Sequence, residues 1–177
     1  MFYGNIKYYD ISNGTGVRTS LFVSGCRVHC PLCFNQVTWD FDYGNPFSKD
    51  VLDKIIESLN SDYIEGLSIL GGEPFEEENQ MVLVELIRKV REVYGDTKTI
   101  WMYSGYLFDK DLFPEDGKKH TEVTNEILSM IDILVDGPFM NDKKNVALNF
   151  RGSSNQRIID MKQTLKEGNI VLSKLNN

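Results

Sequence analysis

Three cysteines carry the clearest chemistry in this sequence. Cys26, Cys30 and Cys33 lie in the segment CRVHCPLC, and the chain has no other cysteine. An odd number of cysteines in a chain that does not start like a secreted protein argues against a disulfide framework. Free cysteine is often a small core residue, but core residues would be scattered along apolar faces, whereas these surround Arg27 and His29. The spacing therefore predicts a loop wrapped around a metal centre.

The absence of a fourth cysteine helps to decide between a zinc site and an iron–sulfur cluster. A structural zinc site takes four protein ligands, so His29 or His120 would have to join the three thiolates. Iron–sulfur electron carriers usually supply four cysteines. Three thiolates would hold three corners of a 4Fe–4S cube and leave one iron open, where a substrate can bind. We therefore expect a catalytic iron–sulfur cluster, with zinc as the alternative.

Alternating strands and helices are expected around this loop, from apolar periodicity and turn residues. The predicted strands are Thr19–Val23, Leu67–Leu70, Lys98–Tyr103, Ile131–Val135 and Gln156–Met161. The predicted helices are 48–59 with Ser48 as N-cap, 76–94 with a core-facing stripe from Leu83 to Val93, and 124–130. Two polar stretches, Asp109–Thr121 and Met140–Ser154, are expected to be exposed loops.

This order of elements indicates the fold class. Strands that alternate with helices form βα units in an α/β fold with a mostly parallel sheet. A complete eight-stranded TIM barrel needs about 250 residues, and this chain has 177. We therefore expect a partial, open TIM-type βα barrel that forms a single domain over residues 1–177.

Reactive residue types follow the predicted strands. The first strand leads into the cysteine loop, the second into Gly71, Gly72 and Glu73, the third into Ser104 and the fourth into Asp136. In parallel βα architectures the carboxyl ends of the strands form the rim of the active site. The pattern therefore predicts that these segments meet on one side of the sheet, as they would in an enzyme.

Charge and hydropathy exclude two classes of partner. The net charge of -7 makes a surface that binds nucleic-acid phosphates unlikely. The longest apolar runs, Met81–Val84 and Ile100–Tyr103, are far shorter than the roughly 20 residues of a membrane span. The first residues, MFYGNIKYYD, lack the charged-then-apolar pattern of a secretion signal, so we expect a cytoplasmic protein.

The motifs together resemble those of the radical S-adenosylmethionine enzymes, which combine CxxxCxxC after one strand with GGEP after the next. The segments NGTGVR (13–18), LFVSGC (21–26) and Cys33-Phe34-Asn35 are similar to those of the glycyl-radical-enzyme activases. LVDGPF (134–139) and RGSSNQR (151–157) favour, within that group, the activases of anaerobic ribonucleotide reductases. One departure is Leu32, where many radical S-adenosylmethionine enzymes have an aromatic residue.

The resemblance implies a reaction and its partners. S-adenosylmethionine would bind the open iron, and an electron from a reduced flavodoxin-type donor would cleave it to methionine and a 5′-deoxyadenosyl radical. That radical would take a hydrogen atom from a glycine in the large subunit of the reductase. The alternatives are an activase of another glycyl radical enzyme, such as pyruvate formate-lyase, and a non-catalytic metal-binding or electron-transfer module.

The resemblance also assigns site residues. With Cys26, Cys30 and Cys33 as cluster ligands, the expected cofactor-binding residues are Leu32, Cys33, Phe34, Asn35, Gly71, Gly72, Glu73, Ser104, Asp136 and Arg157. In the family the segment after the second strand contacts the methionyl amino group, which assigns that contact to Gly71, Gly72 and Glu73. The backbone at Leu32 and Phe34 is expected to border the adenine.

Several of these residues have simpler alternatives. Ser104 and Asp136 carry groups suited to a ribose, and Arg157 is suited to bind a carboxylate through two hydrogen bonds. Glu73 could equally be a solvated carboxylate, and Arg157 a surface ion pair. Arg18 could be a structural ion-pair partner.

Overall fold

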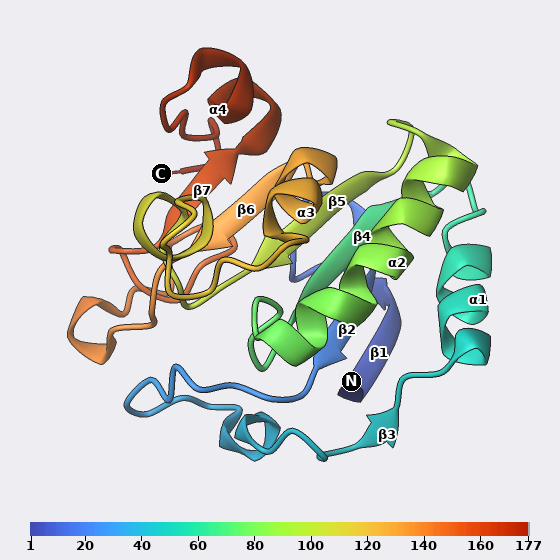
Figure 1. The fold of residues 1–177 in the computed structure, drawn as a ribbon, viewed down its shortest axis with the longest axis horizontal. Helices are drawn as coiled ribbons and strands as arrows, with labels where there is room; N and C mark the ends of the chain where they lie inside the picture. The colour runs from blue at the N-terminus through green and yellow to red at the C-terminus, as the bar shows by residue number, and fades with distance from the viewer. Residues whose placement is uncertain (177) are drawn as a thin grey trace.

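A computed structural model describes residues 1–176 and shows an α/β arrangement of one sheet with helices on one side (Figure 1). The strands are β1 (Phe2–Asp10), β2 (Val17–Val23), β3 (Asn45–Pro46), β4 (Ile64–Gly71), β5 (Thr99–Tyr103), β6 (Ile133–Asp136) and β7 (Arg157–Asp160). The helices are α1 (Lys49–Ser58), α2 (Glu77–Tyr94), α3 (Thr124–Met130) and α4 (Met161–Glu167). Three short helical turns are η1 (Gln36–Trp39), η2 (Phe108–Leu112) and η3 (Asn141–Lys143).

The described strands form one seven-stranded sheet in the order β3-β1-β2-β4-β5-β6-β7. The central strands β2, β4, β5 and β6 run parallel to one another. Antiparallel pairings flank this parallel part: β1 pairs with β2 and with β3 on one side, and β7 pairs with β6 on the other. The sheet is therefore mixed and unclosed, with its parallel part in the middle as the βα pattern predicts.

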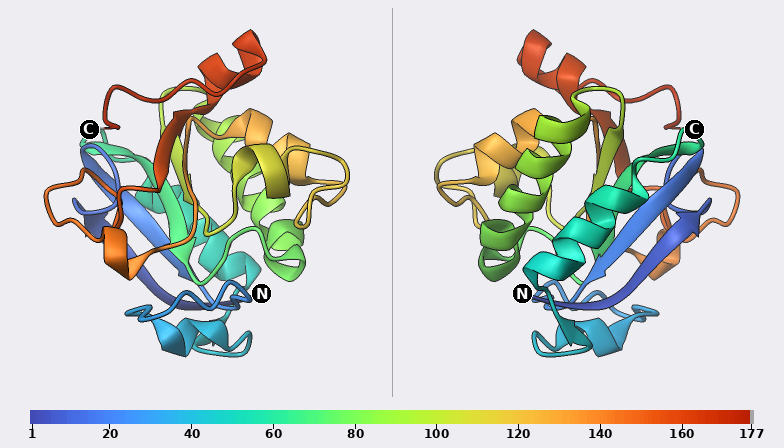
Figure 2. Two further views of the ribbon diagram at one scale, coloured as in Figure 1. Left: turned by 90° about the vertical axis from the view of Figure 1, so that its left-hand side faces the viewer. Right: turned by 90° about the vertical axis from the view of Figure 1, so that its right-hand side faces the viewer.

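Helices α1, α2 and α3 cover one face of this sheet (Figures 1 and 2). Alternate strand residues point toward them and form the main core with the helices, among them Leu21, Leu67, Ile69, Ile100 and Met102, all completely buried. The residues between them point to the opposite face, where Trp101, Val135 and Ile158 form a second, smaller core with Phe150 from a loop. Strand alternation thus gives the sheet two different surfaces.

The predicted strands and helices are confirmed, and 124–130 coincides with α3. Ser48 caps α1 by accepting a hydrogen bond from the Val51 amide at 3.4 Å. The sequence did not reveal β1, β3 or α4. Strand β1 has exposed residues along much of its length and therefore lacks an apolar alternation that would identify it.

Two expectations about burial are wrong. Val93, expected in the core stripe of α2, is 46% exposed, whereas Val90 in the same stripe is completely buried. The stretch Asp109–Thr121 is not simply an exposed loop, since η2 begins at its edge and Leu112 is completely buried in the main core. Over residues 1–176, no helix combines the length and the apolar character that a membrane crossing requires.

Candidate active site

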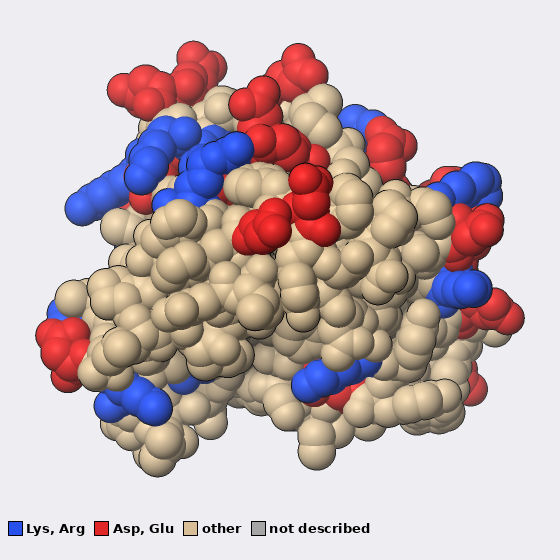
Figure 3. Space-filling view, turned by 90° about the horizontal axis from the view of Figure 1, so that it is seen from below, with Lys and Arg blue, Asp and Glu red and all other residues tan. Residues whose placement is uncertain are grey.

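A cavity of about 450 Å³ lies at the carboxyl ends of the parallel strands. Of the predicted site residues, it is lined by Cys26, Cys30, Cys33, Phe34, Asn35, Gly71, Gly72, Glu73 and Ser104. The cysteine loop lies on the underside of Figure 1, and the molecule seen from that side has a broad area without charged side chains (Figure 3). The expected convergence of strand ends on one site is therefore present in the fold.

The cysteine loop is held at both ends by its own backbone. Immediately after β2, the Gly25 amide donates to the Thr38 carbonyl at 2.8 Å, and the Cys26 amide donates to the Trp39 carbonyl at 3.3 Å. These bonds bring the start of the loop next to η1, which follows the third cysteine. The loop is thereby closed on itself and presents its cysteines to one cavity.

Turns inside the loop set the direction of the second and third cysteines. His29 and Leu32, which directly precede Cys30 and Cys33, both have positive φ angles of 49° and 59°. The Cys33 amide donates to the Cys30 carbonyl at 3.1 Å, and the Asn35 amide points to the Cys33 sulfur at 3.4 Å. These two contacts hold the backbone on either side of Cys33.

The three thiols are free, and their surroundings suit a bound cation. Burial raises the pKa of the Cys26 thiol to about 11, and burial also raises that of Cys30. Thiols of this kind become thiolates when a metal supplies positive charge. Over residues 1–176, no three His, Cys, Asp or Glu side chains are grouped so that they could hold a metal ion. What the cysteines share is the wall of one cavity, with a donor set suited to iron–sulfur ligation.

Both histidines have other contacts. The His29 ring stacks on Trp39 with 4.3 Å between ring centroids, and His120 Nδ1 lies 2.8 Å from the Leu112 carbonyl oxygen. Neither ring lines the cavity in the described structure. The rings of His29 and His120 are therefore engaged by other groups, and zinc stays the alternative to an iron–sulfur cluster.

Gly71 and Gly72 are required by the close approach of the chain's own backbone. Gly71 has a φ of +112°, and a Cβ there would lie 2.7 Å from the Val23 nitrogen. A Cβ on Gly72 would lie 2.6 Å from the Gly25 carbonyl oxygen. The sequence suggested that a ligand comes close to these glycines, whereas the contact that the structure shows is the start of the cysteine loop. Contact with a ligand stays a prediction.

Glu73 is buried, with only 1% of its surface exposed, so the alternative of a solvated carboxylate is wrong. Its carboxylate accepts hydrogen bonds from the Phe75 amide at 2.8 Å, the Gly105 amide at 2.7 Å and the Ser104 hydroxyl at 3.0 Å. Burial raises the pKa of Glu73 to about 7, although these three donors act against the rise. Glu73 therefore links the end of β4 to the end of β5, and its carboxylate forms no salt bridge within residues 1–176.

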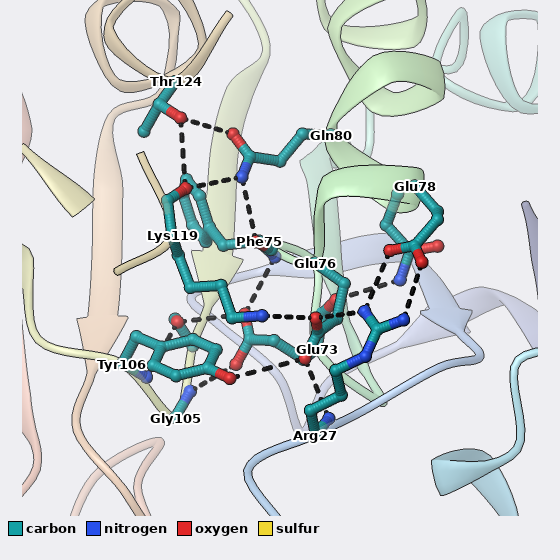
Figure 4. Close-up of polar contacts among 12 residues, drawn as sticks. Arg27, Glu73, Phe75, Glu76, Glu78, Gln80, Gly105, Tyr106, Lys119 and Thr124 are labelled. Carbon is teal, nitrogen blue, oxygen red and sulfur yellow. Dashed lines mark hydrogen bonds and ion pairs between the residues drawn. The ribbon is translucent and has the colours of Figure 1, made fainter. Parts of the chain in front are cut away.

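Glu76 is a second buried carboxylate close by, and no sequence pattern indicates its role (Figure 4). It accepts hydrogen bonds from Lys119 Nζ at 2.6 Å and from Arg27, through the side chain at 2.7 Å and the backbone amide at 2.8 Å. Burial acts to raise the pKa of Glu76, but the bonds from Lys119 and Arg27 outweigh it, so the pKa is lowered. Because Arg27 follows Cys26, this ion pair anchors the cysteine loop to the start of α2.

Three predicted residues lie away from the cavity lining: Leu32, Asp136 and Arg157. Leu32 is 69% exposed. The buried Asp136 carboxylate accepts from Arg157 Nε and from the Phe108 amide, both at 2.8 Å, and Arg157 also pairs with Asp109 at 2.7 Å. The ion-pair alternative for Arg157 is thus present. Cofactor binding by these three residues stays a prediction.

Several residues that line the cavity were missed, including Phe22, Leu70, Tyr103, Val135 and Phe139. Four of them lie on strands and alternate with the core residues that face the helices. Strand periodicity could have identified this second face. It could not have shown that the carboxyl end of this face is open.

Comparison with known proteins places the chain in a family. A family model described as a 4Fe-4S single cluster domain matches residues 12–159. The anaerobic ribonucleoside-triphosphate reductase-activating protein of Salmonella typhi is 40% identical over 155 residues, covering 85% of this chain and 94% of the relative. Proteins of the same name are 39% identical over 155 residues in Escherichia coli K12, and 33% identical over 158 residues in Enterobacteria phage T4. The chain belongs to the family of anaerobic ribonucleoside-triphosphate reductase-activating proteins.

Proposed function

We propose that the chain is a radical S-adenosylmethionine activase that generates the glycyl radical of an anaerobic ribonucleotide reductase. Residues 1–177 would form one radical S-adenosylmethionine domain, and the open sheet would be part of a TIM-type barrel. The observation that carries the proposal is the joint position of CxxxCxxC and GGE on one cavity. It is supported by relatives named as activating proteins of the reductase, which match most of the chain.

In this proposal, Cys26, Cys30 and Cys33 hold a 4Fe–4S cluster whose fourth iron has no protein ligand. The chemistry that this cluster and S-adenosylmethionine supply when bound is one-electron cleavage of the sulfonium to methionine and a 5′-deoxyadenosyl radical. The protein's own task is to bind, orient and shield. The closed cysteine loop and its anchor through Arg27 and Glu76 serve that task by holding the start and the end of the loop in place.

The cavity walls contribute the shielding. Phe22, Leu70, Val135 and Phe139 give the site apolar surfaces, which limit the access of water and other hydrogen donors to a reactive radical. Glu73 fixes the relative position of two strand ends through bonds to Ser104 and Gly105. A rigid rim of this kind is expected where a ligand must be held in one orientation.

The partner in this proposal is the glycine-bearing segment of the reductase. A protein substrate must reach the cavity from outside, and the Phe34 side chain on the cysteine loop is fully exposed beside it. The broad area without charged side chains seen from the same side would let a partner protein bind without burying charges (Figure 3). A reduced flavodoxin-type protein is the proposed source of the electron.

Anaerobic analysis of the purified protein tests the proposal. After reconstitution with iron and sulfide, we expect about four iron and four sulfide ions per chain. With S-adenosylmethionine, a reduced donor and the reductase, we expect 5′-deoxyadenosine and a glycyl radical doublet in electron paramagnetic resonance. Pyruvate formate-lyase in place of the reductase is the control and should give no radical. One zinc per chain without labile sulfide would instead favour the non-catalytic module.

A further inference from the structure

Tyr103 is the last residue of β5 and points to the sheet face that the helices leave uncovered. Its neighbour Met102 is completely buried in the main core, so strand alternation directs Tyr103 to the other side. There it pairs across the sheet with Val135 and lines the cavity that also contains the three cysteines. The site as predicted from the sequence did not include it.

The Tyr103 hydroxyl is buried and has no hydrogen-bond partner within residues 1–176. Other tyrosines near the core do have partners: Tyr94 donates to the Ile56 carbonyl at 2.6 Å, and Tyr106 donates to Glu76 at 3.4 Å. Buried phenols usually find a partner, because a hydroxyl removed from water without one lowers stability. A buried polar group that lacks one points to something that binds there.

Three other buried polar atoms without a partner within residues 1–176 do not have the same position. Those of Ser20, Ser24 and Asn155 belong to residues outside the cavity lining. Tyr103 differs because the residue itself forms part of the cavity wall, between apolar neighbours such as Phe22 and Val135. A cavity wall that combines apolar side chains with a few hydrogen-bonding groups is a common way to fix the orientation of a small ligand.

We propose that the Tyr103 hydroxyl donates a hydrogen bond to a polar atom of the S-adenosylmethionine bound in this cavity. This inference rests on the proposed function. A cavity of about 450 Å³ is large enough for a nucleoside-sized ligand, which carries many hydrogen-bond acceptors. The ligand would reach from the cysteine loop on one wall to β5 on another, and Tyr103 would orient it without taking part in the reaction.

The test compares ligand affinity and stability in Tyr103→Phe. We expect the reconstituted variant to bind S-adenosylmethionine about 5- to 50-fold more weakly, because one hydrogen bond is lost in an apolar site. The unfolding temperature of the ligand-free variant should stay the same or rise, because the substitution removes a buried hydroxyl that has no partner. Equilibrium dialysis and thermal unfolding measure the two effects without any catalytic turnover.

Tyr94→Phe is the matched control. Its hydroxyl has a structural partner in Ile56, so this variant should unfold at a lower temperature and bind S-adenosylmethionine as the unmodified protein does. Unchanged affinity in Tyr103→Phe would overturn the inference, and so would a lowered unfolding temperature like that of the control. If the unmodified protein did not bind S-adenosylmethionine at all, the proposed function itself would fail.

Discussion

The sheet face opposite to α1, α2 and α3 has two ends, which are formed by the same strands. The hydrogen bonding of buried polar groups differs between these two ends. At the amino end, Arg18 is completely buried, and burial lowers its pKa to about 10. Its guanidinium donates to Ser68 Oγ at 2.7 Å and to the carbonyl oxygens of Leu67 and Thr99 at 2.9 Å. It also donates to the Thr15 carbonyl at 3.2 Å and to Thr99 Oγ1 at 2.9 Å. No carboxylate pairs with it in the described structure, so the expected ion pair is replaced by neutral acceptors.

The carboxyl end is left open. Two residues after Trp101, which packs against Arg18 and Phe150, comes Tyr103 with its hydroxyl unpartnered. Nearby, burial raises the pKa of Glu73, whose carboxylate forms no salt bridge in the described part of the chain. Every N–H group of the buried Arg18 guanidinium has an acceptor at one end, whereas at the other end the Tyr103 hydroxyl has no partner within residues 1–176. The amino ends of these strands therefore carry contacts that stabilise the fold, and their carboxyl ends carry groups that could serve a ligand.

The largest expected effect is at the open end. Cys30→Ser should reduce bound iron from about four to less than one per chain after reconstitution, because serine is a poor ligand for iron–sulfur clusters. Since Cys30 is only half-buried on a loop, the free energy of unfolding of the metal-free protein should change by less than about 1 kcal/mol. Iron and sulfide analysis together with urea unfolding measure both.

His29→Ala is the neighbouring control, because the ring of His29 stacks on Trp39 and does not line the cavity. Its iron content should be unchanged. Full iron loading of Cys30→Ser would show that Cys30 is not a ligand. A large loss of unfolding free energy in Cys30→Ser would show that the cysteine loop also stabilises the fold.

The second effect is at the closed end. Arg18→Met should lower the free energy of unfolding by about 3–5 kcal/mol, because it leaves several buried acceptors without donors. Arg18→Lys should recover part of this loss, since an ammonium group has fewer donors than a guanidinium. Urea unfolding measures the loss, and the lysine variant should still bind S-adenosylmethionine normally. Weakened binding by a stable Arg18→Lys would mean that the closed end also serves the ligand.

The third effect is a pH dependence that originates at Glu73. Its pKa is raised from 4.5 to about 7 by burial, so between these values the folded protein holds a proton that the unfolded chain has lost. The contribution of Glu73 to stability is therefore present below about pH 4.5 and is lost as the pH rises through 7, up to about 3 kcal/mol. Glu73→Gln, which cannot titrate, should remove this part of the slope.

Urea unfolding at several pH values between 4.5 and 8 measures the slope. Glu76 serves as the comparison, because the bonds from Lys119 and Arg27 outweigh its burial and lower its pKa. Its contribution is lost as the pH falls below the ordinary range of a glutamate, which is the opposite direction. An identical slope in Glu73→Gln and the unmodified protein would show that Glu73 is ionised throughout.

These contrasts also show which parts of the molecule the sequence could predict. Helix α2 and strands β2, β4 and β5 were predictable because their apolar periodicity is local and regular. The cysteine loop and the GGE segment were predictable because their residue types are tied to particular chemistry. Strand β1 was not predictable, because many of its residues are exposed and its sequence lacks a regular alternation of apolar and polar residues.

The polar pairing could not be predicted, because it depends on residues far apart in the sequence. The approach of Gly72 to Gly25, the pairing of Glu76 with Lys119 and the neutral acceptors around Arg18 all exist only in the folded chain. Tyr103 is likewise an ordinary strand residue in sequence, and only the fold shows that its hydroxyl has no partner.

The smallest expected effect on stability comes from two buried serines, one near Arg18 and one at the cavity. Comparing their alanine variants gives the most direct test of the difference between the two ends. Ser68 Oγ accepts from Arg18 at 2.7 Å and donates to the Asn13 carbonyl at 2.5 Å. Ser104 Oγ donates to Glu73 and accepts from the Tyr106 amide, both at 3.0 Å. Since each hydroxyl makes two buried hydrogen bonds, Ser68→Ala and Ser104→Ala should each lower the free energy of unfolding by about 1–2 kcal/mol.

The two variants should differ in ligand binding, because Ser104 lines the cavity and Ser68 does not. We expect Ser104→Ala to weaken S-adenosylmethionine binding several-fold, through loss of a polar group at the site and looser support of Glu73, and Ser68→Ala to leave it unchanged. Equilibrium dialysis on the reconstituted proteins measures this. Equal affinities would show that the open end is no more specialised for the ligand than the closed end, since the two serines are otherwise matched in residue type, burial and hydrogen bonding.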